Sequence, residues 1–144
     1  MKILVSAICT IVMSILPAVV FCGEPTPLKE FKIPASRWAP GSFGTVSGER
    51  LVIEVPEQAK AAMNCAGTEI DLVPFRGQSL CFTIRGRAWN ISTPRDSWNG
   101  IKFMLYYRDA DGQEYWHHPS HLKGTFDWRE ISFSCAISPT AEKG

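Results

Sequence analysis

Four separate segments of this chain alternate apolar and polar residues with a period of two, and this feature constrains the fold most. In the segment 79–88, for example, Leu80, Phe82 and Ile84 occupy alternate positions. A two-residue period places alternate side chains on opposite faces of a strand that buries one face. The pattern therefore predicts β-strands rather than helices. The segments are 50–55, 79–88, 101–108 and 128–137.

Shorter strands are predicted at 70–73 and 113–118. Residues 109–112 (Asp-Ala-Asp-Gly) are expected to form a four-residue hairpin turn before the second of them, because Gly112 can adopt a positive φ. Six strands separated by turns indicate an all-β fold, an antiparallel β-sandwich. The predicted core residues are Leu51, Ile53, Leu80, Phe82, Ile84, Phe103, Leu105, Phe133 and Ile137.

The first 22 residues have the composition of a secretory signal peptide. Lys2 gives a positive start, and no charged residue follows before Cys22, where cleavage is expected. A transmembrane anchor is one alternative for an apolar run of this length, and a lipoprotein attached at Cys22 is another. We divide the chain into a signal peptide (1–22), a linker (23–30) and a domain (31–144). We expect the domain to be secreted, periplasmic or located at the cell surface.

Without the signal peptide, the numbers of basic and acidic side chains are equal, at 14 each. Balanced charge argues against binding that depends on nucleic acid or an anionic membrane. Aromatic residues make up 11% of the chain and include five tryptophans, which suits uncharged, flat-faced ligands. Three cysteines remain after removal of the signal peptide: Cys65, Cys81 and Cys135. At least one of them is unpaired in a monomer, and Cys135 fits a buried apolar position.

Several segments then resemble the jelly-roll carbohydrate-binding domains that precede the catalytic domain in bacterial cellulases and related β-glycanases. The likeness extends over about residues 31–141. It implies a jelly roll, a non-catalytic function in binding β-glucan-type polysaccharide, and a C-terminal catalytic domain as partner in a longer parent. The segments that carry it are 70–78 (IDLVPFRGQ), 82–85 (FTIR), 98–107 (WNGIKFMLYY) and 124–133 (GTFDWREISF).

This chain departs from the family pattern at its C-terminal end. Similar domains continue with two further strands, whereas residues 138–144 are expected to form only a turn. We therefore expect a sandwich that lacks its last strands, belonging to a longer secreted glycanase or to a truncated remnant of one. Alone, residues 23–144 should be marginally stable and prone to associate through an unpaired edge.

A glycan-binding face needs flat aromatic rings beside fixed polar groups. With a four-residue turn, Arg108 lies opposite Gln113, and Tyr106 lies opposite Tyr115, so both tyrosines face solvent. Trp89 and Trp98 flank a loop that is a candidate wall of a cleft. The predicted carbohydrate-binding residues are Arg85, Arg87, Lys102, Tyr106, Arg108, Tyr115 and His117.

No catalytic residue, metal ligand or cofactor is assigned. His117 and His118 are neighbours on a strand and point to opposite faces, and Asp109 and Asp111 fit the role of turn formers. The family often holds a structural calcium ion, but this turn does not match its usual position. No nucleophile elbow, zinc motif or phosphate loop occurs. The alternatives to a binding module are a structural domain that packs on a catalytic domain, and a small β-sandwich glycanase or lyase.

Overall fold

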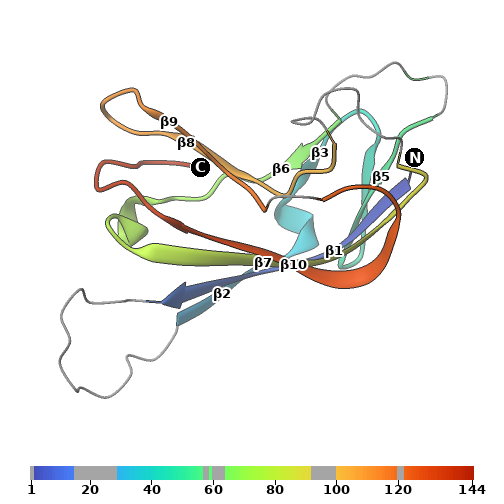
Figure 1. The fold of residues 1–144 in the computed structure, drawn as a ribbon, viewed down its shortest axis with the longest axis horizontal. Coiled ribbons are helices and arrows are strands. Elements are labelled where there is room, and N and C mark those ends of the chain that lie inside the picture. Colours follow the sequence, from blue (N-terminus) through green and yellow to red (C-terminus); the bar gives the residue numbers. More distant parts are fainter. Residues whose placement is uncertain (1, 15–28, 57–58, 60–63, 92–99, 120–121) are drawn as a thin grey trace.

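A computed structural model describes residues 2–14, 29–56, 59, 64–91, 100–119 and 122–144, and it confirms an all-β fold (Figure 1). The helices among the described residues are two short 3₁₀ helices, and neither is long and apolar enough to cross a membrane. The elements are β1 (Lys2–Ser14), β2 (Lys29–Ile33), η1 (Ala35–Arg37), β3 (Ala39–Pro40), β4 (Gly44–Ser47), β5 (Arg50–Glu54), β6 (Ala66–Gly67), η2 (Val73–Phe75), β7 (Ser79–Trp89), β8 (Leu105–Arg108), β9 (Glu114–His117) and β10 (Phe126–Ala136).

The main sheet has six strands in the order β10-β7-β1-β5-β4, with β2 paired to β1, and all of its pairs are antiparallel. The strands β7 and β10 pair from Ala88 with Phe126 to Ser79 with Ala136. Their long alternating segments are the ones that the sequence pattern marks most clearly. The predictions of strands at 50–55, 79–88 and 128–137 are confirmed, with small shifts at the ends.

In the full chain, β1 lies in the middle of this sheet. It pairs with β7 along one edge and with β5 and β2 along the other. These residues belong to the predicted signal peptide, whose remainder, with residues 23–28 of the predicted linker, lies outside the described part of the chain. Export and cleavage stay predictions.

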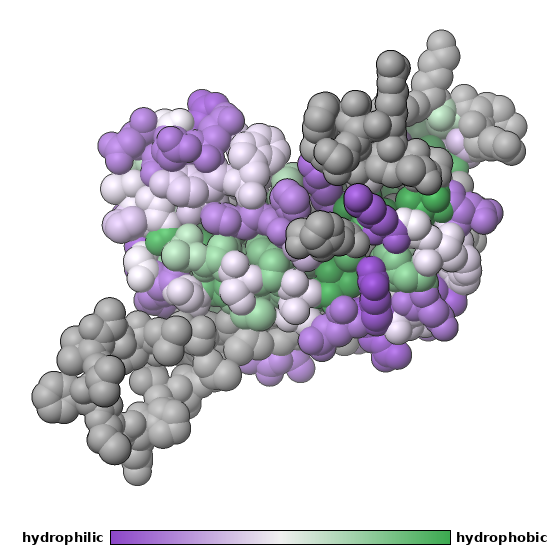
Figure 2. Space-filling view, in the orientation of Figure 1, coloured by the Kyte–Doolittle hydropathy of each residue, from purple (hydrophilic) through white to green (hydrophobic). Residues whose placement is uncertain are grey.

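A second layer covers one face of the main sheet. It contains the two-stranded pairs β8-β9 and β3-β6 together with the C-terminal segment (Figure 1). In the space-filling view, a hydrophobic band lies between the hydrophilic surface of the β8-β9 hairpin and the main sheet (Figure 2). Seven of the nine predicted core residues are buried, whereas Ile53 and Phe133 are half-buried. The buried seven are Leu51, Leu80, Phe82, Ile84, Phe103, Leu105 and Ile137.

One predicted strand is absent, and another is shorter than expected. Residues 70–73 form no strand, because Val73 begins the turn η2, whose Pro74 has no N–H for a ladder. Residues 101–104 keep their alternating burial but lie outside β8. The first pair of the hairpin joins Leu105 to His117, and Pro119 follows close behind His117, so the hairpin ladder does not extend to 101–104.

The C-terminal segment is more ordered than the predicted turn. Gly144 and Ile70 exchange two backbone hydrogen bonds of 2.8 and 3.0 Å, and the Leu72 N–H donates to the Glu142 carbonyl at 2.8 Å. On its other side, Ala141 forms an antiparallel bridge with Asp109. Residues 141–144 therefore lie in the second layer between residues 70–72 and β8. As predicted, residues 138–144 contain a turn and no strand, but isolated bridges at Ala141 and Lys143 pair this segment with both of its neighbours.

Candidate functional site

The hairpin that carries most of the predicted binding residues turns over a three-residue loop. The Asp109 N–H donates to the Gln113 carbonyl at 3.0 Å, so these two residues pair and residues 110–112 form the loop. Gly112 has a φ of 80°, which a three-residue hairpin loop requires at its last position. The Asp109 Oδ1 accepts the N–H groups of Asp111 and Gln113 at 3.1 and 3.0 Å. The interpretation of Asp109 as a turn former is confirmed.

Because the loop is one residue shorter than predicted, the register of β9 is shifted. Tyr106 lies opposite Trp116, and Tyr107 lies opposite Tyr115. A shift by one residue moves every side chain of a strand to its other face. Tyr115 and His117 therefore point inward, and the prediction that they lie on the exposed face is wrong. Trp116, which a four-residue turn would direct inward, is 55% exposed.

The exposed face of the hairpin combines two aromatic rings with an ion pair. The ring centroids of Tyr106 and Trp116 are 4.1 Å apart, and Tyr106 is 38% exposed. Arg108 forms an ion pair with Glu114, and the Tyr106 hydroxyl donates to the Glu114 Oε1 at 3.1 Å. The hydrogen bonds from Arg108 and Tyr106 lower the pKa of Glu114, which favours its charged form. We call these four residues, Tyr106, Arg108, Glu114 and Trp116, the hairpin face.

The inner face of the hairpin is fixed to the end of β10 by a stack of rings and shared hydrogen bonds. Tyr107 and Tyr115 stack with centroids 4.6 Å apart, and His117 lies beside both. The Asp109 Oδ2 accepts the Tyr115 hydroxyl at 3.0 Å and the Ser138 hydroxyl at 3.1 Å. Burial raises the pKa of Asp109, but its hydrogen bonds outweigh burial and the net shift is downward. This network holds the hairpin face in place.

The two predicted arginines of β7 lie on a different surface. Alternation along β7 directs Arg85 and Arg87 to the face of the main sheet opposite the core. There the Arg87 guanidinium lies 3.9 Å from the ring centroid of Trp89 and 5.0 Å from that of Trp128. A bulge in β10 between Phe126 and Arg129 contains Trp128. The predicted site is thus divided between two surfaces.

The remaining predicted residues have separate positions. Lys102 is exposed in the segment before β8, and Trp98 lies outside the described residues. Glu114 and Trp116 were missed as site residues. The sequence signal that could have found them is Asp109, three residues before Gly112. This spacing also fits a three-residue loop with an Asx-type turn, and such a loop places Glu114 and Trp116 on the exposed face.

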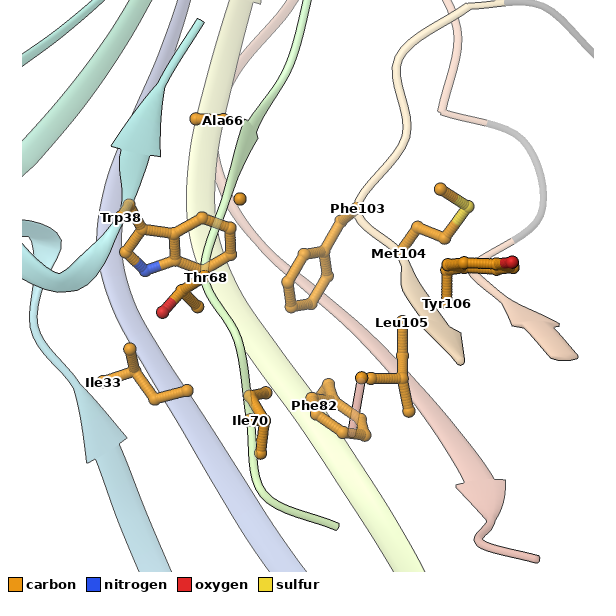
Figure 3. Close-up of a pocket in the computed structure, with 12 residues that line it drawn as sticks. Ile33, Trp38, Ala66, Thr68, Ile70, Phe82, Phe103, Met104, Leu105 and Tyr106 are labelled. Carbon is orange, nitrogen blue, oxygen red and sulfur yellow. The ribbon is translucent and has the colours of Figure 1, made fainter. Parts of the chain in front are cut away.

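A cleft of about 80 Å³ lies beside the hairpin face (Figure 3). Trp38 and Thr68 lie on one side, Met104 and Tyr106 on the other, with Phe103 between them. The Trp38 Nε1 is buried and has no hydrogen-bond partner among the residues that the structure describes. The cleft is lined by Ile33, Trp38, Ala66, Gly67, Thr68, Ile70, Phe82, Phe103, Met104, Leu105, Tyr106 and Gly144.

Among the described side chains, no group of three or more His, Cys, Asp or Glu residues is arranged to hold a metal ion. His117 is half-buried beside two tyrosines, while His118 is exposed and contacts the Pro119 carbonyl. The chemistry that the hairpin face offers is stacking by Tyr106 and Trp116 and hydrogen bonding by Arg108 and Glu114. Comparison with known proteins found no matching family model, no matching curated protein and no matching solved structure.

Proposed function

We propose that this protein is a non-catalytic polysaccharide-binding module of jelly-roll type, which binds β-glucan-type glycans through the hairpin face. The observation that carries the proposal is the exposed pair of Tyr106 and Trp116 directly beside the ion pair of Arg108 and Glu114. Three of the five exposed large hydrophobic side chains among the described residues, Met104, Tyr106 and Trp116, lie on the hairpin or immediately before it. This clustering supports a ligand-binding surface.

The chemistry of a pyranose ring suits this face. Its C–H side packs on flat aromatic rings, and its hydroxyl groups need donors and acceptors in fixed positions. Arg108 and Glu114 supply both kinds of group, and their mutual contact limits the rotamer freedom that binding would otherwise remove. In a longer parent, the module would direct a C-terminal glycanase domain to its insoluble substrate.

Isothermal titration of the full chain with cello-, xylo- and manno-oligosaccharides tests the proposal. We expect binding of a β-linked gluco-oligosaccharide that Tyr106→Ala weakens severalfold while the melting temperature stays nearly unchanged. If no oligosaccharide of the three series binds, the proposal is contradicted and a structural domain is favoured. A reducing-sugar assay on the same glycans separates a binding module from a small glycanase, because we expect no release of sugar.

A further inference from the structure

Two arginines of β7 gather around one indole ring on the outer face of the main sheet. Alternation along β7 places Arg85 and Arg87 on the face that is turned away from the core and from the second layer (Figure 1). Their Cζ atoms lie 5.9 and 5.0 Å from the ring centroid of Trp128, on the neighbouring strand β10. The Arg87 Cζ also lies 3.9 Å from the ring centroid of Trp89. Two positive charges therefore converge on Trp128.

The two indole contacts hold the Arg87 side chain in place. A guanidinium at 3.9 Å from a ring centroid packs on the face of that ring, and this contact uses its flat surface rather than its N–H groups. The Arg87 Nε is buried without a hydrogen-bond partner among the described residues, whereas the two terminal nitrogens are not buried in this way and reach solvent. Arg87 thus presents N–H donors on a side chain that needs little further ordering to bind a ligand.

The charges of these arginines have no counter-ion in the part of the chain that the structure describes. Glu130 is the cross-strand neighbour of Arg85, and yet no ion pair joins a described carboxylate to either arginine. The nearby Asp127 Oδ1 accepts the Trp128 N–H at 2.8 Å. On the other side of β7, the sequence of β1 contains no acidic residue. An anionic ligand would therefore meet two unpaired guanidinium groups.

The surroundings of the arginines favour a carboxylate on a sugar ring. The planar fork of an arginine binds a planar carboxylate through two parallel N–H···O bonds. Residues 23–144 hold equal numbers of acidic and basic side chains, so long-range attraction to a polyanion such as nucleic acid is weak. The half-buried Trp128 leaves part of its ring surface open to the C–H side of a pyranose. A uronic acid residue combines such a C–H side with one carboxylate.

We propose that Arg85, Arg87 and Trp128 form a binding site for a uronic acid residue of an acidic polysaccharide. The terminal N–H groups of Arg87 donate to the carboxylate, and the sugar ring packs on Trp128. Arg85, two residues away and thus about 7 Å along the strand, adds the second positive charge. The site lies on β7 and β10, whereas the hairpin face lies in the second layer, so this inference does not depend on neutral glycan binding by the hairpin face.

Isothermal titration of the full chain with trigalacturonate tests the ligand class. Its methyl ester keeps the sugar rings and removes the charges, and acetyl-Asp-Asp-Asp-amide keeps three carboxylates and removes the rings. We expect trigalacturonate to bind at least tenfold more tightly than either. Its affinity should fall severalfold between about 50 and 500 mM NaCl, because salt screens contacts between charges at the surface.

Equal affinity for the methyl ester would overturn the carboxylate contact, and equal affinity for the aspartate peptide would overturn the sugar as the ligand. Binding of gluco-oligosaccharides without any binding of trigalacturonate would overturn this site and leave the hairpin face as proposed. Binding of trigalacturonate alone would support this site and contradict the hairpin face.

Substitutions then locate the site. Arg87→Gln should weaken trigalacturonate binding at least tenfold, and Arg87→Lys severalfold, because lysine keeps the charge and loses the planar fork. Arg129→Gln is the matched control: Arg129 is also exposed and lies 4.0 Å over the ring of Phe126, but it pairs with Gly86 and faces the other side of the sheet. Its affinity should stay unchanged.

Arg85→Gln provides a second test, because Arg85 is exposed and the variant leaves the packing of Arg87 on both indoles in place. We expect a loss of affinity of severalfold and a melting temperature within about 2 °C of the unmodified chain. If Arg85→Gln and Arg87→Gln both bind trigalacturonate as tightly as the unmodified chain, or if Arg129→Gln loses as much affinity as they do, the site is not on this face.

Discussion

The rings of Tyr106 and Trp116 lie opposite each other on the solvent side of the β8-β9 hairpin, with centroids 4.1 Å apart and planes tilted by 39°. Trp116 is more than half exposed, so it contributes little to the core. Its neighbour Tyr115 points to the other face and stacks on Tyr107. Two adjacent aromatic residues of one strand thus lie in different environments.

Trp116→Ala should reduce the affinity for a bound gluco-oligosaccharide by about tenfold, since a stacked aromatic contributes ~1 kcal/mol or more. The melting temperature should change by less than about 2 °C. Isothermal titration and a thermal melt measure the two effects. Phe31→Ala is the control, because Phe31 is also exposed (38%) but lies on β2. If both variants bind as tightly as the unmodified chain, the hairpin face is not the glycan site.

Asp109→Ala should destabilise the fold. The carboxylate accepts four hydrogen bonds, from the backbone of Asp111 and Gln113 and from the hydroxyls of Tyr115 and Ser138. Its loss leaves the hairpin turn and the end of β10 without their common acceptor. We expect the melting temperature to fall by about 5 °C or more. Asp111→Ala serves as the control, because the Asp111 side chain is exposed; an equal loss in both variants would argue against this role of Asp109.

The stability of the fold should fall as the pH is lowered through 6.5. Burial, with a smaller contribution from His118, lowers the pKa of His117 below its ordinary value of 6.5. Between the folded pKa and 6.5, the unfolded chain binds the proton more readily, so acid favours unfolding; above 6.5 both states are neutral and the effect vanishes. Melting temperatures between pH 8 and 5 measure this dependence.

His117→Phe should flatten that pH dependence, because it removes the titrating group and keeps a ring beside Tyr107 and Tyr115. His118→Gln should retain most of it, since the His118 side chain is exposed. A pH profile that is the same in His117→Phe and the unmodified chain would assign the acid sensitivity to other groups.

The three cysteines of the predicted mature domain should differ in reactivity. Burial raises the pKa of the Cys135 thiol to about 11, whereas Cys65 is exposed and Cys81 is half-buried. At pH 8, only about one Cys135 thiol in a thousand is ionised, and the thiolate is the reactive form. Iodoacetamide followed by peptide mass spectrometry should show rapid labelling of Cys65 and labelling of Cys135 only after unfolding. Equal rates at Cys65 and Cys135 in the folded chain would contradict the buried position.

The alternating pattern predicted the inward faces of β7, β8 and β10 correctly, because which side a strand residue faces depends only on its place in a local period of two. Leu80, Phe82, Leu105 and Ile137 are buried as expected. The boundaries of the strands were less predictable. Phe103 keeps its inward position without ladder pairing to any described residue, so burial and strand pairing separate in that segment.

From the sequence alone, the all-β class, most of the core and the exposure of Tyr106 and Arg108 could be determined, since these follow from local alternation. The tertiary structure decided the register of β9, because both a three- and a four-residue loop suit Asp109 to Gly112, and the single residue of difference exchanges Tyr115 for Trp116 at the surface. It also separated Arg85 and Arg87 from the hairpin. The pairing partners of β7 and the layer that β8 joins depend on contacts between residues far apart in the sequence, and a local period carries no information about these.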